Sequence, residues 1–291
     1  MQKIEGHHLM VKTADGIRWH LVEAGASNKL TVLLVAGFPE SAYAWRRVIP
    51  ILANRYHVFA IDLPGQGYSS VPATGFDTKT TSERIQNLLS KLNIGKYIYV
   101  GHDVGSWVGF AFAHLFTKNL LGVALIDGNI PSVTLPNAIP LDSESWRSWH
   151  FLFNALPDLP ETLLKGNERE LLEWFFSNKA ANWKESFSKE DVDEYEKNYT
   201  MPGVMRGMLG YYRAVLEDIK IHKKFIEQKI KIPILAVSGE LGSSRDLADK
   251  LTPFCEKLHG ETIPKSGHYV PEKEPQALCK CLSTFIDNID R

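Results

Sequence analysis

One carboxylate stands between two glycines at the point where a strand gives way to a helix. Residues 97–100 (Tyr-Ile-Tyr-Val) form a short apolar run rich in aromatic and β-branched side chains, which predicts a buried strand. Residues 106–118 predict an apolar helix, and Gly101-x-Asp103-x-Gly105 lies between the two. Because glycine permits a tight, strained turn, Asp103 should project from the apex of this turn, above the sheet. We expect Asp103 to be a nucleophile.

The residue type at this apex restricts the chemistry. A serine alkylated at a saturated carbon would become an ether, which water does not readily cleave, so the enzyme would stop after one turnover. An aspartate alkylated in the same way becomes an ester, which an activated water can hydrolyse. Asp103 therefore indicates displacement at carbon, with an epoxide or an alkyl halide as the electrophile. The alternative for the Gly-Asp-Gly pattern alone is a turn with a capping aspartate.

Two further side chains are expected beside this nucleophile. Asp127 follows the apolar run 121–126, and His268 ends the loop 264–268, after a short strand predicted at 260–263. Catalytic side chains of parallel sheets gather at the carboxyl ends of the strands. His268 would take a proton from the hydrolytic water, and Asp127 would hold and stabilise the imidazolium. Glu240, after the strand predicted at 229–237, is the rival acid, and we prefer Asp127 because it ends its strand directly.

An oxygen of the reacting carboxylate needs hydrogen-bond donors. We expect the backbone N–H groups of Phe38 and Val104 to supply them. Phe38 lies just beyond the strand predicted at 31–35, and Val104 follows the nucleophile. Both strands would end at the same edge of the sheet.

The rest of the chain supplies the frame for these residues. Residues 7–24 alternate as a hairpin that turns at 14–16; further strands are predicted at 56–61 and helices at 43–53, 80–92, 246–258 and 275–288. Strands that alternate with helices indicate a parallel sheet with right-handed crossovers. From 129 to 229 the alternation stops and aromatic-rich helical patterns dominate. We predict an α/β core, residues 1–128 and 230–291, with a mostly parallel sheet, helices on both faces, and a helical lid inserted at 129–229.

The chain resembles the α/β-hydrolase-fold epoxide hydrolases and dehalogenases along nearly its whole length. The motifs that match are Gly37-Phe38-Pro39-Glu40, Asp62-Leu63-Pro64-Gly65-Gln66-Gly67, Gly101-His102-Asp103-Val104-Gly105 and Gly267-His268. The order nucleophile, acid, histidine is that of the α/β-hydrolase triad. The resemblance is greatest to the bacterial Cif-like epoxide hydrolases, whose acid follows the strand before the lid. One departure is Ala36, where the family usually carries His.

The resemblance also implies residues in the lid. Two lid segments of the Cif-like epoxide hydrolases are matched here by Trp149-His150-Phe151 and Tyr211-Tyr212-Arg213-Ala214. This match implies that His150 and Tyr212 hydrogen-bond the epoxide oxygen. Trp107, Trp149 and Tyr211 are expected to line the substrate pocket. Neighbours on a helix point about 100° apart, so one of the two tyrosines is expected to belong to the core. Alternatively, His150 is a buried, hydrogen-bonded histidine that takes no part in catalysis.

The leaving group separates the two halves of this family. Opening an epoxide creates an alkoxide, which needs a donor such as His150 or Tyr212. Many dehalogenases carry Trp directly after the nucleophile, and haloacetate dehalogenases carry Arg near it, whereas this chain has Val104. We therefore expect an epoxide hydrolase that uses water to convert a small apolar epoxide to a vicinal diol, through an ester on Asp103. The alternatives are a haloalkane or haloacetate dehalogenase and a non-catalytic binding protein of the same fold.

Composition and charge exclude other classes of protein. The 291 residues are 44% apolar and 23% charged, and 33 Lys and Arg against 34 Asp and Glu give a net charge of -1. This balance provides no field suited to nucleic acid or an anionic membrane, and we expect no membrane span. Three cysteines indicate neither a disulfide scaffold nor a metal site, and no cofactor is expected. If Met1 is the native start, we expect a cytoplasmic monomer or homodimer; a start left by removal of a signal peptide would look the same.

Overall fold

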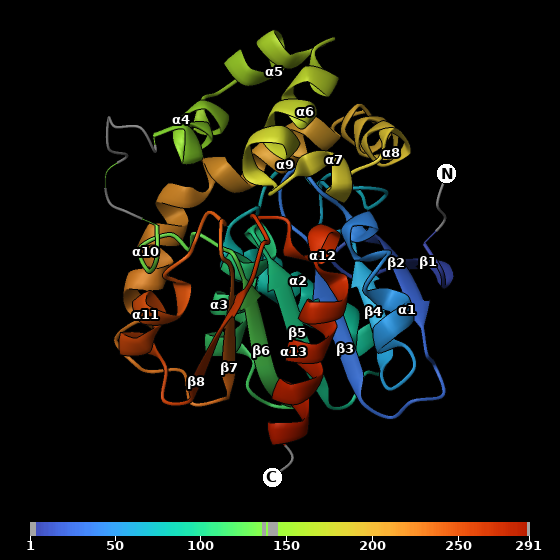
Figure 1. The fold of residues 1–291 in the computed structure, drawn as a ribbon, viewed down its shortest axis with the longest axis vertical. Helices are drawn as coiled ribbons and strands as arrows, with labels where there is room; N and C mark the ends of the chain where they lie inside the picture. The colour runs from blue at the N-terminus through green and yellow to red at the C-terminus, as the bar shows by residue number, and fades with distance from the viewer. Residues whose placement is uncertain (1–3, 136–137, 139–144, 290–291) are drawn as a thin grey trace.

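A single mixed sheet runs through the core of the protein. The computed structural model describes residues 4–135, 138 and 145–289. Within these residues eight strands form one sheet in the order β1-β2-β4-β3-β5-β6-β7-β8. β1 (His7–Lys12) and β2 (Arg18–Ala24) form the expected hairpin, and β2 pairs antiparallel with β4 (His57–Ile61). The hairpin lies at one edge of the sheet, near the N-terminus in Figure 1.

The remaining pairings in the sheet are parallel and carry the residues of interest. They involve β3 (Thr31–Val35), β5 (Tyr97–His102), β6 (Leu120–Ile126), β7 (Ile234–Gly239) and β8 (Leu258–Ile263). β3, β5 and β7 are buried at every position, as expected of parallel strands covered on both faces. The carboxyl ends of these strands therefore converge on one edge of the sheet.

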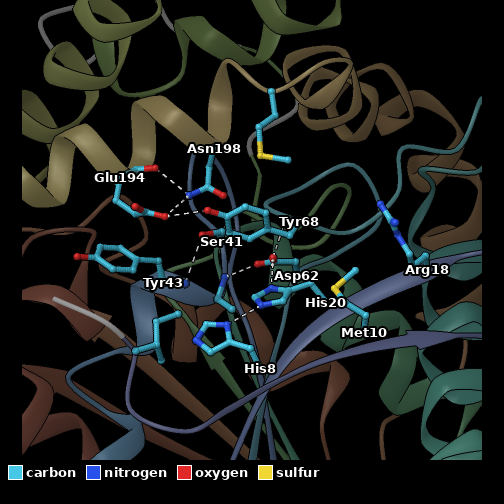
Figure 2. Close-up of a pocket in the computed structure, with 13 residues that line it drawn as sticks. His8, Met10, Arg18, His20, Ser41, Tyr43, Asp62, Tyr68, Glu194 and Asn198 are labelled. Carbon is cyan, nitrogen blue, oxygen red and sulfur yellow. Dashed lines mark hydrogen bonds and ion pairs between the residues drawn. The ribbon is translucent and has the colours of Figure 1, made fainter. Parts of the chain in front are cut away.

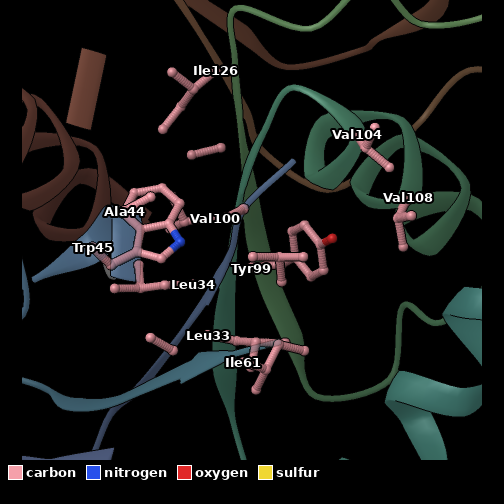
Figure 3. Packing of buried hydrophobic residues seen from close by; sticks show 14 of the residues in the cluster. Leu33, Leu34, Ala44, Trp45, Ile61, Tyr99, Val100, Val104, Val108 and Ile126 are labelled. Atoms are coloured by element: carbon pink, nitrogen blue, oxygen red, sulfur yellow. The ribbon is translucent and has the colours of Figure 1, made fainter. Parts of the chain in front are cut away.

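Helices cover both faces of this sheet. They are α1 (Ile49–Leu52), α2 (Thr78–Lys91), α3 (Val104–Leu115), α11 (Leu247–Leu251), α12 (Val270–Lys273) and α13 (Pro275–Ile289). Figure 3 shows Val100 on the side of Trp45, and its neighbour Tyr99 on the side of Val104 and Val108 of α3. Successive residues of β5 thus enter two separate apolar layers.

A helical region is inserted between β6 and β7 and lies over the end of the sheet (Figure 1). Its elements are the 3₁₀ turn η2 (Ser145–Arg147), α4 (Trp149–Ala155), α5 (Leu159–Leu164), α6 (Glu168–Lys179), α7 (Trp183–Ser186), α8 (Lys189–Tyr199), α9 (Val204–Arg213) and α10 (Val215–Phe225). We call this region the lid. The expected α/β class, with a mostly parallel sheet and an inserted helical region, is confirmed.

Two expected helices are shorter than the sequence indicated. The helix expected at 43–53 is split into the 3₁₀ turn η1 (Ala42–Trp45) and α1, because the ring of Pro50 clashes with a continuous helix through residue 46. The helix expected at 246–258 ends at Leu251 and is followed by the 3₁₀ turn η3 (Thr252–Phe254). Pro253 has no N–H to continue the ladder, and β8 begins at Leu258. Both errors come from prolines inside an apolar periodic pattern.

Among the described residues, no helix is both long and apolar enough to cross a membrane.

The crossing of β5 and α3 leaves no room for a side chain at Gly101. A Cβ at this position would lie 2.2 Å from the carbonyl oxygen of Gly105, whereas a Cβ at Gly95 would meet nothing within 4 Å. We expect Gly101→Ala to lower the free energy of unfolding by about 1–3 kcal/mol, as overpacking typically does, and Gly95→Ala to change it by less than about 0.5 kcal/mol. Urea unfolding of both variants measures the difference. Equal stabilities would contradict this account of the turn.

Candidate active site

Asp103 lies at the apex of a strained turn between β5 and α3. Its backbone has φ 52° and ψ -115°, which a non-glycine residue adopts only when the surrounding structure enforces it. The two glycines of the motif make the turn possible by close backbone contact. A Cβ at Gly105 would lie 2.2 Å from the carbonyl oxygen of Val35, so the first turn of α3 packs directly on the end of β3. This packing holds the carboxylate above the sheet edge, with 7% of the residue exposed.

A backbone donor from the loop after β3 contacts this carboxylate. The Phe38 N–H donates a hydrogen bond of 2.8 Å to Asp103 Oδ1. The backbone nitrogen of Val104 lies near the same oxygen. A Cβ at Gly37 would lie 2.5 Å from this nitrogen and 2.4 Å from Asp103 Oδ1. The expected donors therefore lie together, although only the Phe38 bond to Asp103 is formed among the described contacts. Glycine at 37 is required by this close approach.

His268 lies between two carboxylates. Its Nε2 is 3.4 Å from Asp103 Oδ2, and its Nδ1 is 2.8 Å from Asp127 Oδ1. All three residues are buried. The loop after β8 presents His268, and its backbone N–H donates to the carbonyl oxygen of Lys179 in the lid. The structure thus brings together the three residues that the sequence placed at separate strand ends.

Asp127 is held by backbone donors from the loop after β7. Its Oδ2 accepts from the Gly239 N–H at 3.0 Å, and its Oδ1 accepts from the N–H groups of Ser243 and Ser244 at 2.8 and 3.2 Å. A Cβ at Gly242 would lie 1.9 Å from Asp127 Oδ2, so this loop has room for only one carboxylate. The rival Glu240 is exposed and accepts from the Lys265 N–H. Of the two rival acids, Asp127 and not Glu240 therefore contacts His268, at Nδ1.

The electrostatics of this chain favour a charged histidine between two carboxylates. Burial alone would raise the pKa of Asp103, but the hydrogen bond and positive charge of His268 hold it well below its usual range. Burial would lower the pKa of His268, but Asp103 and Asp127 outweigh it and raise that pKa to about 9. At neutral pH the resting site therefore contains an ionised Asp103 beside an imidazolium. While Asp103 keeps its charge, His268 cannot act as a base.

Aromatic side chains from the lid and from the core together form a wall near this carboxylate. Tyr212 packs edge-on against Trp107 and Phe38, with ring centroids 5.5 and 5.2 Å apart, and His150 lies 5.6 Å from Tyr212. Burial, and then the negative charge of Asp103, raise the pKa of Tyr212 well above 10. His150 is also buried, and Trp149 packs beside it at 6.3 Å. These four side chains, expected from the sequence, form one continuous surface with Phe38.

Tyr211 does not belong to this wall, and its expected place in the pocket needs correction. Its hydroxyl donates to the carbonyl oxygen of Pro64 at 2.8 Å, and its ring packs on Phe76. Tyr212 is the next residue on α9 and therefore points about 100° away. Tyr211 anchors the lid to the loop after β4, while Tyr212 lies close enough to Asp103 for the charge of that carboxylate to raise its pKa.

The sequence interpretation missed three buried polar residues around the site. His102 has Nδ1 2.8 Å from Glu40 Oε2, and its Nε2 is 2.9 Å from the carbonyl oxygen of His268, so it braces the loop that presents the histidine. Both His102 and Glu40 lie within motifs that the sequence analysis had recognised, and this position could have marked them as residues of the site. The third is Lys179, whose Nζ lies 3.4 Å from His150 Nε2. No motif contained it.

Two of the cavities among the described residues differ in their relation to the site. One of about 700 Å³ opens between the hairpin and α8, where His20 joins His8 to Asp62 (Figure 2). Neither Asp103 nor His268 lines this cavity, so it lies outside the candidate active site. Another of about 510 Å³ is lined by Phe151 and Tyr212 together with apolar residues of α4 and α10. Neither Asp103 nor His268 lines this cavity either, but Tyr212 borders both the cavity and the aromatic wall.

Comparisons with known proteins agree with this geometry. A family model described as alpha/beta hydrolase fold matches residues 31–275. A soluble epoxide hydrolase of Corynebacterium sp. (strain C12) is 31% identical over 278 residues, 94% of each chain. The crystal structure of Cfl2 from Burkholderia cenocepacia is 46% identical, with a TM-score of 0.93 over 96% of this chain and 95% of that one. A fluoroacetate dehalogenase of Burkholderia sp is 26% identical over 98% of this chain and 95% of its own length.

The chain therefore belongs to the α/β-hydrolase fold family and, within it, to the group of epoxide hydrolases and dehalogenases. The resemblance identified from the motifs is confirmed at this level.

The acid can be identified without any substrate. We expect Asp127→Asn to lower the pKa of His268 from about 9 by roughly one unit or more, because it removes one of the two charges that raise it. Glu240→Gln is the matched control and should leave this pKa unchanged, since Glu240 contacts Lys265 instead. NMR titration of the imidazole in both variants measures the shift. If the pKa of His268 shifted only in Glu240→Gln, the assignment of Asp127 as the acid would be wrong.

Proposed function

We propose that this protein is an epoxide hydrolase that forms a covalent ester on Asp103. The observation that carries the proposal is an ionised carboxylate at a strained turn, with a backbone donor on one oxygen and the Asp127–His268 pair beside the other. A carboxylate in this position forms an ester with a carbon electrophile, and the adjoining histidine is placed to cleave that ester. The relationship to the Corynebacterium epoxide hydrolase supports the same reaction.

The first step is attack by Asp103 on an epoxide carbon. Oδ1 accepts a hydrogen bond of 2.8 Å from the Phe38 N–H, whereas Oδ2 has only the longer contact of 3.4 Å with His268 Nε2, so Oδ2 is the oxygen that would form the new C–O bond. The C–O bond of the epoxide breaks and its electron pair stays on the departing oxygen as an alkoxide. Tyr212 and His150 line the wall opposite the nucleophile and would donate hydrogen bonds to this oxygen. The largely apolar cavity beside Phe151 and Tyr212 borders this wall, although Asp103 does not line it, and its lining favours a small apolar epoxide.

The second step is hydrolysis of the ester. Alkylation removes the negative charge of Asp103, which is one cause of the raised pKa of His268. The pKa of His268 then falls, and the imidazolium releases its proton to solvent. The neutral imidazole can now accept a proton from water as that water attacks the ester carbonyl. Asp127 stabilises the imidazolium that forms, and the Phe38 N–H donates to the carbonyl oxygen as it becomes an oxyanion. Release of the diol restores the ionised Asp103.

Dehalogenation remains the second candidate because of specific buried donors. The indole N–H groups of Trp107 and Trp149 have no hydrogen-bond partner among the described residues, and Lys179 places a cation beside His150. Such donors can stabilise a departing halide, and a cation can bind a substrate carboxylate. The relationship to a fluoroacetate dehalogenase points the same way. Both reactions use the same nucleophile and differ only in what leaves.

Accumulation of the ester distinguishes these reactions. His268→Gln removes the base of the second step, so we expect the ester on Asp103 to accumulate when the variant is incubated with epoxides, haloalkanes or haloacetates. Intact-mass spectrometry measures the adduct: an epoxide adds its full mass, and a halide adds its mass less the hydrogen halide.

His268→Gln combined with Asp103→Asn is the control and should gain no mass. An adduct from halides alone would replace our proposal by the second candidate. A folded variant that forms no adduct at all would favour a non-catalytic binding protein.

The two neighbouring tyrosines of α9 provide a matched pair for the alkylation step. We expect Tyr212→Phe to slow ester formation about 100-fold, because it removes a donor to the developing alkoxide. Tyr211→Phe removes a hydroxyl from the same helix, but that hydroxyl contacts Pro64 and should leave the rate within about threefold. Rapid-quench mass measurements in the His268→Gln background give both rates. Equal effects of the two substitutions would remove Tyr212 from the mechanism.

A further inference from the structure

Lys179 is a buried cation without a carboxylate partner among the described residues. It ends α6 with 7% of the residue exposed, and its ammonium lies over the ring of Phe175 at 5.3 Å from the centroid. The only hydrogen-bond partner of this ammonium among the described residues is His150 Nε2 at 3.4 Å. A buried ammonium with so little compensation is unfavourable for folding. Its position beside the lid histidine therefore points to a functional role.

The contact with Lys179 fixes which nitrogen of His150 carries the hydrogen. An ammonium group can only donate, so Nε2 must accept and the hydrogen of the neutral imidazole lies on Nδ1. Burial, and then the charge of Lys179, lower the pKa of His150 well below its usual value, so the ring is neutral. Nδ1 is buried and has no hydrogen-bond partner among the described residues. It is the nitrogen left to donate to a ligand.

We propose that Lys179 supplies, through His150, the proton that the opened epoxide oxygen takes up. This inference rests on the proposed function. The alkoxide takes the hydrogen from His150 Nδ1, and His150 Nε2 takes a proton from the Lys179 ammonium. The imidazole stays neutral throughout and changes tautomer, while Lys179 becomes an amine. Before the second step the His268 imidazolium releases its proton to solvent, and hydrolysis of the ester by water makes it an imidazolium again. Lys179 regains a proton from solvent water, which protonates His150 Nδ1 while His150 Nε2 returns its hydrogen to the Lys179 amine. One turnover then converts epoxide and water to a diol and returns every group to its starting state.

The charges around Lys179 make it a better acid than Tyr212. Burial, helped by the charge of Arg147, lowers the pKa of Lys179 and outweighs the opposite effect of Asp103 and Asp127, so that the pKa is about 8. Asp103 and Asp127 face Lys179 from the core, and Arg147 and His150 face it from the lid. The loop that carries His268 also contacts the Lys179 backbone. The pKa of Tyr212 lies well above 10. At neutral pH an alkoxide would therefore take its proton from the Lys179–His150 pair, with Tyr212 as a hydrogen-bond donor.

The pH dependence of ester formation tests this relay. In the His268→Gln background we expect the rate of alkylation by an epoxide to be constant below about pH 8 and to fall about tenfold per unit above it. Lys179→Met should be about 100-fold slower and should lose this alkaline limb. Lys179→Arg keeps a charge and a donor but does not release its proton, so it should also be slow. A Lys179→Met variant that keeps the alkaline limb, or stays within threefold of the parent, would overturn the proposal.

The tautomer of His150 gives a readout that requires no substrate. We expect ¹⁵N chemical shifts of the resting protein to show hydrogen on Nδ1 of His150, and on Nε2 in Lys179→Met, with the signal assigned by its loss in His150→Gln. The carbonyl of Lys179 that accepts from His268 is retained in both Lys179 variants, so an unchanged His268 signal and cooperative unfolding report an intact fold.

The outcomes separate this inference from the proposed function. An epoxide adduct with an unaltered pH profile in Lys179→Met leaves the epoxide hydrolase standing and removes the relay. No epoxide adduct in any background removes both. If Lys179→Met raises only the KM of carboxylate-bearing epoxides and keeps the alkaline limb, Lys179 is an anion-binding residue and the relay is wrong.

Discussion

The site depends on one buried cation held between two carboxylates. His268 contacts Asp103 and Asp127, and all three groups are removed from water. Removing charges from water costs several kcal/mol per ion, which opposite charges alone do not always offset. Here backbone donors complete the solvation: three N–H groups satisfy Asp127, and one satisfies Asp103. The conformations of the loops after β3, β7 and β8 therefore depend on their contacts with Asp103, Asp127 and His268.

Those donors can approach only where side chains are missing. Gly37 admits the carboxylate of Asp103, and Gly242 admits that of Asp127, because a Cβ at either would overlap a carboxylate oxygen. The same reasoning explains how the loop after β7 accommodates the acid. The missing side chain of Gly242 leaves space for the Asp127 carboxylate, which arrives from β6.

The sequence predicted the residues that lie at strand ends and missed those brought in by tertiary packing. Asp103, Asp127 and His268 each follow an apolar run, so a parallel sheet brings them together once strand and helix alternate. Lys179 ends a helix of mixed polarity, where a lysine is ordinarily explained by the helix dipole. Only the packing of α6 on the core buries it beside His150. Tyr211 and Tyr212 share one motif, and only the orientation of α9 separates the core residue from the site residue. Lid residues are harder to predict because no strand end marks them.

The charge on Asp103 links both proton transfers that the proposed reaction needs. While Asp103 is ionised, its charge raises the pKa of His268 and of Lys179, so both groups hold their protons. Ester formation neutralises Asp103 at the same moment as the alkoxide appears. The loss of that charge makes Lys179 a stronger acid when a proton is required, and it lowers the pKa of His268 before water must be activated. A single alkylation event would therefore prepare the acid for the first step and the base for the second, without movement of either group.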